Sequence, residues 1–237
     1  MSPDSHSSQP DAPGPAGISA SGVSSNGSRG PAPTSTGLPP RTRAAVRFGA
    51  VTGELSRRLG LGAGSTVGGR AVLALDPGAL RRLGSGRRSV VVSGTNGKTT
   101  TTSLLRAAMA TAGPVVTNAQ GANLPAGIAA VLAAAAPGVD AVLEVDEAWL
   151  AGVAAALQPA VVVLLNLSRD QLDRNNEVRT LAGSWRGLLA GLPRTLVVAN
   201  ADDPLVVWAA GAARRVVWVG AGQPWTADAS GCPACGG

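Results

Sequence analysis

The feature that most constrains the fold is a series of short, apolar runs that alternate with longer helix-like runs after residue 88. The apolar runs are rich in Val and Leu and lack the polar alternation of a sheet with one wet face. Apolar strands that alternate with helices predict a mostly parallel sheet with helices on both faces, which is an α/β architecture. The expected strands are 89–92, 114–117, 141–145, 160–165, 195–199 and 215–219, and the expected helices are 99–112, 124–136, 147–157, 176–190 and 203–212.

Two segments precede this alternation. Residues 1–41 consist mostly of Ser, Pro, Gly and Ala, and a segment with so little apolar surface to bury is predicted to be a disordered tail. Residues 42–88 predict a lead-in made of an amphipathic helix, a short strand at 70–75 and a helix at 77–83 with Pro near its start. The apolar residues at helical spacing in the first helix are Val46, Phe48, Val51, Leu55 and Leu59.

Composition excludes several classes of protein. The only histidine, His6, lies in the tail, so the folded part can build neither a Ser-His-Asp triad nor a histidine-ligated metal site. The net charge is +6, but the arginines are scattered and the chain has one Phe and no Tyr, so we expect no nucleic-acid partner. The apolar runs are too short for a signal peptide or a membrane span, which predicts a cytoplasmic protein without an integral membrane segment.

The stretch VVVSGTNGKTT, residues 90–100, contains the only lysine of the chain, Lys98. It joins an expected strand to an expected helix through a Gly-rich loop, whose backbone N–H groups can face one concavity beside a helix N-terminus. A lysine there neutralises phosphate charge, and Thr99 offers a hydroxyl to Mg²⁺. A turn that binds nothing is the alternative, but a chain that elsewhere uses arginine has kept a lysine here. The predicted nucleotide-binding residues are Gly94, Thr95, Asn96, Gly97, Lys98, Thr99 and Thr100.

The loop sequence GTNGKTTT departs from a standard Walker A motif, because Val92 stands where that motif has a glycine. It resembles the ATP-binding loop of the Mur ligase superfamily, which includes the folylpolyglutamate synthases. Three later stretches, AVLEVDEAWL, LLNLSRDQLDRNNEV and VVANADDPLV, resemble further motifs of that superfamily in the same order. The resemblance implies a Mur ligase-type ATP-binding domain over residues 89–230. The residues that it assigns are Thr99 and Glu144 to Mg²⁺, and Asn200 and Asp203 to the nucleotide.

Two departures from the common superfamily pattern indicate one branch of it. Gln171 stands in RDQLD where many members have a metal-binding histidine. Many members also have a carbamylated lysine, which cannot occur within this chain because its only lysine is Lys98. The ending CPACGG adds a C-x-x-C pair, Cys232 and Cys235, which by itself leaves a redox pair, half of a zinc site or chance open. Together with GANLPAG, these features resemble the amidating branch of the superfamily. That resemblance implies the first half of a zinc ribbon at 231–237, which would bind Zn²⁺ only with a second cysteine pair.

This resemblance implies an ATP-dependent carbon–nitrogen ligase of peptidoglycan synthesis. ATP would phosphorylate the α-carboxylate of the D-glutamate in the lipid II stem peptide, and ammonia would displace phosphate from the acyl phosphate to leave D-isoglutamine. The implied partner is a GatD-like glutamine amidotransferase subunit that supplies the ammonia, and the implied place is the inner face of the membrane. Two alternatives stay open: another Mur-superfamily ligase such as a folylpolyglutamate synthase, or a non-enzymatic zinc-ribbon or nucleic-acid-binding module.

The superfamily also has a C-terminal domain, which in the amidating branch carries a catalytic aspartate. No counterpart of that domain follows the C-x-x-C pair in this sequence. We therefore expect the 237 residues to be a fragment or a shortened gene product that is inactive in isolation, and no catalytic residue is assigned within it.

Six polar residues near expected strand ends have two interpretations each. The acidic ones could act on a metal or substrate, or could merely complement helix dipoles. The asparagines could contact Mg²⁺ or substrate, or could serve as turn and cap residues. The turn is slightly favoured for the first asparagine, and the others stay open. These residues are Asn118, Asn123, Asp146, Glu147, Asp170 and Asp173.

Overall fold

The computed structural model describes residues 37–59, 65–118, 122–167 and 175–222, together with Cys232 and Ala234. The chain divides into two units, and all of these residues belong to the second, Pro33–Gly237. Most of the expected tail lies outside the described residues, so its disorder stays a prediction. The first helix, α1 (Pro40–Arg58), begins within the last residues that were assigned to the tail.

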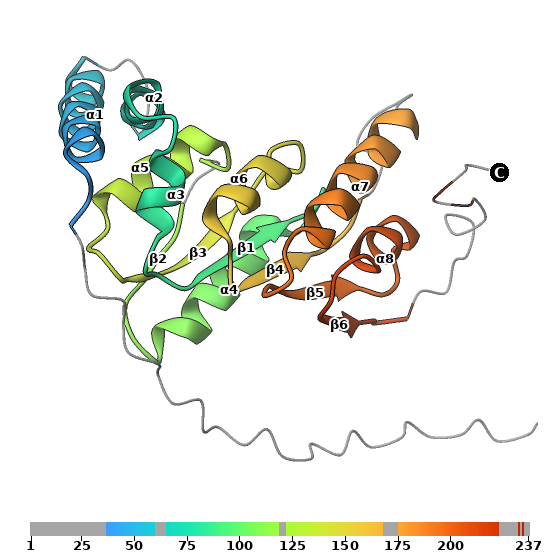
Figure 1. Ribbon diagram of the computed structural model, residues 1–237. Coiled ribbons are helices and arrows are strands. Elements are labelled where there is room, and N and C mark those ends of the chain that lie inside the picture. The colour runs from blue at the N-terminus through green and yellow to red at the C-terminus, as the bar shows by residue number, and fades with distance from the viewer. Residues whose placement is uncertain are drawn as a thin grey trace, which may run out of the picture. The chain divides into compact units, whose positions relative to one another are not determined.

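A six-stranded sheet forms the centre of the described chain, and all its neighbouring strands pair in parallel (Figure 1). Its strands are β1 Ser89–Ser93, β2 Val115–Val116, β3 Asp140–Glu144, β4 Val161–Leu164, β5 Leu196–Asn200 and β6 Val216–Val219. Their order is β2-β3-β1-β4-β5-β6, so the first strand lies in the middle. The predicted α/β class is confirmed, and each predicted strand after residue 88 is found to within one residue at either end.

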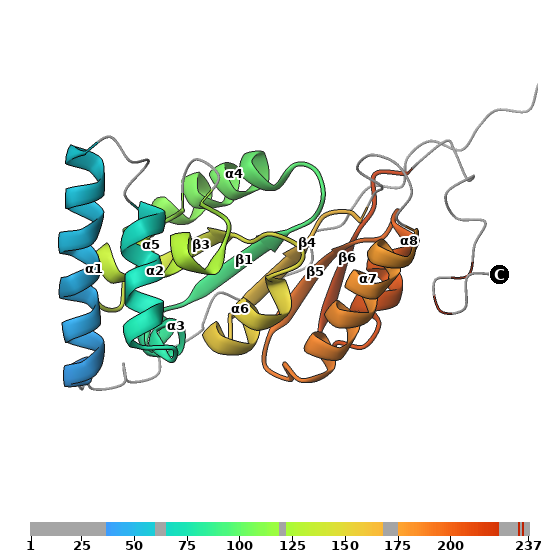
Figure 2. The ribbon, with the colours of Figure 1, turned by 90° about the horizontal axis from the view of Figure 1, so that it is seen from above.

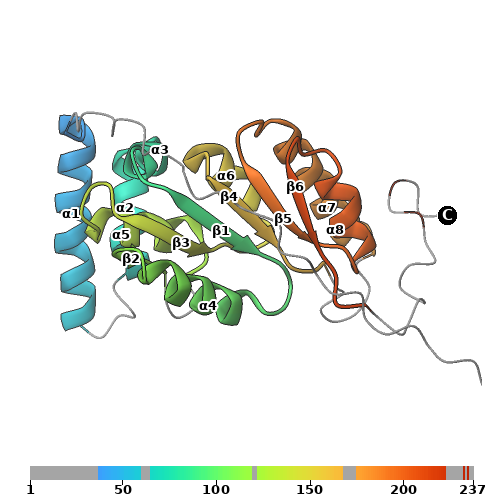
Figure 3. The same ribbon diagram turned by 90° about the horizontal axis from the view of Figure 1, so that it is seen from below.

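Helices cover both faces of the sheet (Figure 2, Figure 3). Those that follow the strands are α4 Lys98–Ala110, α5 Pro125–Ala134, α6 Leu150–Leu157, α7 Asn175–Ala190 and α8 Pro204–Ala210. Helix α4 lies against β1, β2 and β3 on one face, and the four later helices lie on the other. Right-handed crossovers explain this division, because the chain moves one way along the sheet from β1 to β2 and the opposite way afterwards.

Two apolar clusters fill the space between these layers. The larger one includes the fully buried Leu143 and Trp185 and lies between the sheet and the later helices. The smaller one includes Val92 and Val142, and Leu105 of α4 packs against it. Because the central strands are buried on both faces, their sequences are apolar runs rather than alternations.

The lead-in contains helices only, among its described residues, and the strand predicted at 70–75 is wrong. Its helices after α1 are α2 Ser65–Leu75 and α3 Ala79–Gly84. A short apolar run without alternation does not distinguish the period of a strand from that of a helix. The two glycines before this run lower its helix propensity, which favoured the strand. Tertiary packing decides the outcome. A Cβ at Gly68 would lie 2.6 Å from the carbonyl oxygen of Gly49 in α1. A Cβ at Gly69 would lie 1.7 Å from that of Ala126 in α5.

The helix predicted from the apolar positions of the lead-in is confirmed as α1, but small residues form its packed face. Its buried residues are Thr42, Ala45, Gly49, Gly53 and Ser56. A Cβ at Gly49 would lie 2.5 Å from Cγ2 of Val72 in α2, so the two helices approach too closely for large side chains. Four of the five apolar residues are instead more than half exposed: Phe48, Val51, Leu55 and Leu59.

Asp76, directly after α2, ties the lead-in helices together. Its carboxylate accepts hydrogen bonds from Thr42 Oγ1 at 2.6 Å and from the Gly78 amide at 3.1 Å, and it pairs with Arg82 of α3. Burial works to raise the pKa of the Asp76 carboxyl, but the hydrogen bonds and the charge of Arg82 outweigh it and hold this pKa below its ordinary value. The contact with Thr42 fixes which side of α1 faces α2.

Replacing Gly69 with alanine should destabilise the fold, because the new methyl group would overlap the Ala126 carbonyl and push α2 away from α5. We expect the free energy of unfolding, measured in urea, to fall by about 1–3 kcal/mol, the usual cost of overpacking. Gly152→Ala in α6 is the matched control, because apart from neighbouring backbone of its own helix no atom lies within 4 Å of the added Cβ. That change should leave stability unchanged or raise it by about 0.5–1 kcal/mol. Equal stabilities of the two variants would contradict the close approach of α2 and α5.

Candidate functional site

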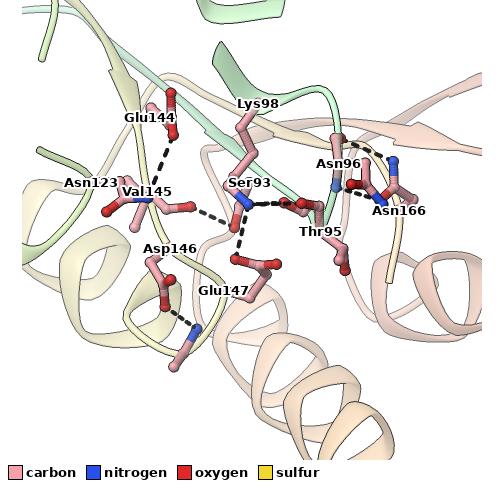
Figure 4. A network of polar contacts seen from close by, with 12 residues as sticks. Ser93, Thr95, Asn96, Lys98, Asn123, Glu144, Val145, Asp146, Glu147 and Asn166 are labelled. Atoms are coloured by element: carbon pink, nitrogen blue, oxygen red, sulfur yellow. Dashed lines mark hydrogen bonds and ion pairs between the residues drawn. The ribbon is translucent and has the colours of Figure 1, made fainter. Parts of the chain in front are cut away.

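The predicted loop lies where the central strand ends (Figure 4). Strand β1 ends at Ser93, α4 begins at Lys98, and the neighbouring strand β3 ends at Glu144. Because Val92 pairs with Glu144 in the parallel ladder, the loop and the carboxylate lie at the same edge of the sheet. Open parallel sheets bind their ligands at this edge, near the strand where the chain changes direction.

Two glycines of the loop are required by its backbone. Gly94 has a φ of 147° and Gly97 a φ of 83°, a region that side chains disfavour. A Cβ at Gly94 would also lie 2.8 Å from the Cβ of Leu165 and 2.9 Å from the amide nitrogen of Asn166. The loop therefore turns sharply and passes close to the segment that follows β4.

Asn166 holds the loop in place. Its carbonyl oxygen accepts from the Thr95 amide at 2.9 Å, and its Oδ1 accepts from the Asn96 amide at 2.8 Å. Its Nδ2 donates to the Asn96 carbonyl at 3.1 Å. Two of the amides predicted to face phosphate thus bond to Asn166. No role was predicted for Asn166 from the sequence, although it is a polar residue directly after an expected strand, which was the available signal.

The ammonium of Lys98 lies within the loop and makes three polar contacts. It donates to the carbonyl oxygens of Gly94 at 2.5 Å and Thr95 at 3.1 Å, and it lies 3.2 Å from Oε2 of Glu147. Both charged side chains are largely buried. Glu147 lies in the turn before α6, and its carbonyl accepts from Nε1 of the buried Trp185 at 3.1 Å. Of the two interpretations left open for Glu147, the ion pair with Lys98 favours a role in the site.

Thr99, the next residue along α4, meets the carboxylate at the end of β3. Its Oγ1 donates to Oε2 of Glu144 at 2.8 Å, and Nδ2 of Asn123 lies 3.5 Å from Oε1. The structure therefore brings together the two residues that were predicted to hold Mg²⁺. A hydroxyl and a carboxylate are hard oxygen donors of the kind that Mg²⁺ accepts, so the pair fits this ion.

Buried hydrogen bonds hold the end of β3 in position. Asn118 is buried, and it accepts from the amide of Glu144 at 2.8 Å and donates to its carbonyl at 2.7 Å. Its Nδ2 also donates to the Ala122 carbonyl at 2.8 Å. Ser93 Oγ donates to the Val145 carbonyl at 2.9 Å. Asn118 thus serves the structural role that was slightly favoured from the sequence.

Asp146 serves a turn, and Asn123 lies beside the site. Oδ1 of Asp146 accepts from the amide of Ala148 at 3.1 Å, two residues before α6 begins. The Asp146 amide donates to the carbonyl of Asn123 at 3.1 Å, which brings Asn123 alongside Glu144. A turn role therefore explains Asp146, whereas a contact of Asn123 with Mg²⁺ or substrate stays a prediction.

Asn200 is the last residue of β5, and Asp203 directly precedes α8. Strand β5 is separated from β1 by β4. Oδ1 of Asn200 accepts from the Asp202 amide at 2.9 Å. Asp203 caps α8 by accepting from the amides of Leu205 and Val206, and its Oδ2 accepts from the Leu167 amide at 2.7 Å. The structure places both residues at the same edge as the loop but gives each a local structural role, so their contact with a nucleotide stays a prediction.

Several predicted residues fall outside the described residues, namely Asp170, Gln171, Asp173 and Cys235. Cys232 is described and is exposed. Within the described ranges, no three His, Cys, Asp or Glu side chains gather as a metal site would require. In the same ranges, every helix is too short or too polar to cross a lipid bilayer.

Residues 92–229 match the Mur ligase middle domain. This chain therefore belongs to the Mur ligase family, which confirms the resemblance seen in its motifs. It is similar to the lipid II isoglutaminyl synthase (glutamine-hydrolyzing) subunit MurT of Streptococcus pneumoniae, with 39% identity over 150 residues, 61% of this chain and 34% of that one. It is also similar to the subunit MurT of Staphylococcus aureus (strain N315), with 30% identity over 203 residues, 81% of this chain and 46% of that one.

Solved structures share the fold. The UDP-N-acetylmuramoylalanyl-D-glutamyl-2,6-diaminopimelate–D-alanyl-D-alanyl ligase of Acinetobacter baumannii superimposes with a TM-score of 0.53, over 64% of this chain and 35% of that one. Its sequence identity is 19%, so this likeness concerns the fold alone. The chain spans between a third and a half of the length of the curated relatives described above.

Proposed function

We propose that this chain is the nucleotide-binding part of a ligase subunit that amidates lipid II in peptidoglycan synthesis. The observation that carries the proposal is the Lys98 loop beside the Thr99–Glu144 pair, in a chain of the Mur ligase family. The substrate and the nitrogen source are proposed from the relatives that are named as glutamine-hydrolysing lipid II isoglutaminyl synthase subunits.

The phosphates of ATP would lie at the start of α4. The amides of a first helical turn lack intrahelical acceptors, and the dipole there favours negative charge. The amides in question belong to Lys98, Thr99 and Thr100. The ammonium of Lys98 would exchange its contact with Glu147, now at 3.2 Å, for phosphate oxygens. Asn200 or Asp203, farther along the same edge, would face the nucleoside.

A magnesium ion would be held by Thr99 and Glu144. Mg²⁺ in phosphate-binding sites usually takes one or two protein oxygens and completes its shell with phosphate oxygens and water. Thr99 Oγ1 and Glu144 Oε2 lie 2.8 Å apart and offer such oxygens. The ion would neutralise charge on the transferred phosphoryl group. Asn123, beside the second carboxylate oxygen, would orient Glu144.

The proposed reaction has two steps. An oxygen of the D-glutamate α-carboxylate attacks the γ-phosphorus of ATP, and ADP leaves, which gives an acyl phosphate. Ammonia then attacks the carbonyl carbon, phosphate leaves and a proton is lost, which gives D-isoglutamine. Phosphoryl transfer depends mainly on positioning and charge neutralisation, and these are what Lys98 and the amides of α4 would provide.

The ammonia would come from a separate GatD-like glutamine amidotransferase subunit. At neutral pH ammonium predominates over free ammonia, so an amidating ligase gains from a coupled glutaminase. A glutaminase needs an activated nucleophile, usually a thiolate beside a base, and this chain has no histidine besides His6. The reaction would take place in the cytoplasm, at the inner face of the membrane that carries the lipid-linked substrate.

The cysteine pair Cys232 and Cys235 would form half of a zinc ribbon. A closed structural zinc site needs four ligands, and this pair supplies two thiolates. We therefore expect these 237 residues to bind Zn²⁺ weakly or not at all, and a chain that adds a second cysteine pair to bind it stoichiometrically.

Replacing Lys98 with alanine should weaken the binding of Mg-ATP without unfolding the chain. Loss of a charge-assisted contact costs about 1.5–3 kcal/mol, which corresponds to a fall in affinity of about 10- to 100-fold by calorimetric titration. Arg106→Ala is the control, because it removes one positive charge from an exposed position on the same helix. Equal affinities of the parent and the Lys98 variant, with unchanged ATPase turnover in the complete complex, would remove Lys98 from the site.

The full-length protein together with a GatD-like subunit should amidate lipid II with glutamine and ATP, as followed by mass spectrometry. Without the partner, it should do so only at high ammonium concentration, because no other source of ammonia remains. The proposal would fail if the protein alone used glutamine efficiently. It would also fail if the pair extended folate with glutamate instead.

A further inference from the structure

The outward face of α1, together with its C-cap residue Leu59, carries four large apolar side chains. Phe48, Val51, Leu55 and Leu59 recur every three or four residues, so they line one side of the helix. Their exposed fractions are 52%, 66%, 55% and 61%. Scattered exposed apolar residues are ordinary, but an apolar row along one helix marks an interaction surface. We call these four residues the apolar row.

The packing of α1 prevents this row from turning inward. Thr42, Gly49 and Gly53 are buried on the opposite side, where α1 meets α2. A Cβ at Gly49 would lie 2.5 Å from Val72, and Thr42 is bonded to the buried Asp76. Only the small side of α1 fits against α2, so the exposure of the apolar row is imposed by the fold. In two views at right angles, α1 is the outermost helix on its side of the sheet (Figure 1, Figure 2).

Positive charge flanks the apolar row. Helix α1 contains five arginines and one acidic residue, Glu54, which is engaged by Arg57 and Arg58 at 2.5 and 2.8 Å. By helical spacing, Arg43, Arg47 and Arg58 lie along one side of the row, and all three are exposed. Long arginine side chains can keep their charge at a polar surface while their stems lie against apolar groups.

We propose that α1 docks this chain on an anionic lipid surface, with the apolar row inserted among the headgroups and the arginines against lipid phosphates. A basic helix with an apolar side that lies open is typical of interfacial membrane binding. Charge complementarity favours lipid over a second copy of the chain, because two α1 helices would bring ten arginines together. The inference extends the proposed function, since a lipid-linked substrate would bring the chain to a bilayer. Helix α1 packs on α2, and α2 packs on α5. Docking through α1 would therefore hold the carboxyl ends of the strands at a fixed distance from the bilayer.

Co-sedimentation with vesicles tests this surface without ATP or lipid II. The 237-residue chain should bind vesicles of equal parts phosphatidylglycerol and phosphatidylcholine, and should bind phosphatidylcholine vesicles much more weakly. Leu55→Ser should lower the partition coefficient about tenfold, the effect of withdrawing one large apolar side chain from the interface. Leu104→Ser is the matched control, because Leu104 on α4 is 66% exposed but lies outside α1.

The contribution of the arginine charges to vesicle binding is tested with two double variants. The double variant R43Q/R47Q should weaken binding to the anionic vesicles and reduce its dependence on salt. The double variant R106Q/R194Q removes the same charge from exposed positions elsewhere and should bind like the parent. Circular dichroism of every variant should match that of the parent, because all substituted side chains are exposed.

Three results would overturn the proposal. The first is binding that does not discriminate between the two vesicle types. The second is an equal loss from Leu55→Ser and Leu104→Ser. The third is a stable dimer in sedimentation equilibrium that Leu55→Ser converts to a monomer, with no vesicle binding by the parent. If vesicles bind as expected but lipid II is not amidated by the complete complex, the docking surface stands and the proposed function fails.

Discussion

Strand β1 is hydrogen-bonded to β3 on one side and to β4 on the other, and both ladders continue beyond the strand ends. The amide of Val145 donates to the Val92 carbonyl at 2.9 Å, and the amide of Leu165 donates to the Ser93 carbonyl at 3.0 Å. Because all three strands run in the same direction, the segments that follow them meet at one edge. The loop after β1, the carboxylate of Glu144 and the side chain of Asn166 lie together for this reason.

The first two residues of α4 face different carboxylates. Lys98 contacts Glu147 in the turn before α6, and Thr99 contacts Glu144 at the end of β3. One helical turn therefore presents a cation to one carboxylate and a hydroxyl to the other. The arrangement is suited to a phosphate with a divalent cation, since the lysine would neutralise one part of the phosphate and the cation the other. On the other side of the loop, Asn166 holds Asn96 through two hydrogen bonds and so fixes the position of the loop beside Lys98 and Thr99.

The sequence predicted the parts that depend on local signals. Short apolar runs that alternate with helix-like runs located each strand of the sheet, and the glycines before Lys98 located the loop. Contacts between distant segments were not predicted: Asn96 meets Asn166 across 70 residues, and Lys98 meets Glu147 across 49. The strand predicted at 70–75 was wrong for a similar reason, because the close contacts of Gly68 and Gly69 with two other helices decide that segment. In α1 the helical period was read correctly, but which side is packed depends on α2.

We propose above all that Thr99 and Glu144 hold the magnesium ion of a nucleotide at the start of α4. The most direct test is the affinity for a non-hydrolysable ATP analogue, measured by calorimetry with and without Mg²⁺, in the parent and in Thr99→Val. Valine keeps the shape of threonine but removes the oxygen ligand. We predict that Mg²⁺ strengthens binding to the parent, that the variant loses most of this gain, and that the two affinities without Mg²⁺ are equal. A variant that keeps the full gain from Mg²⁺ would contradict the claim.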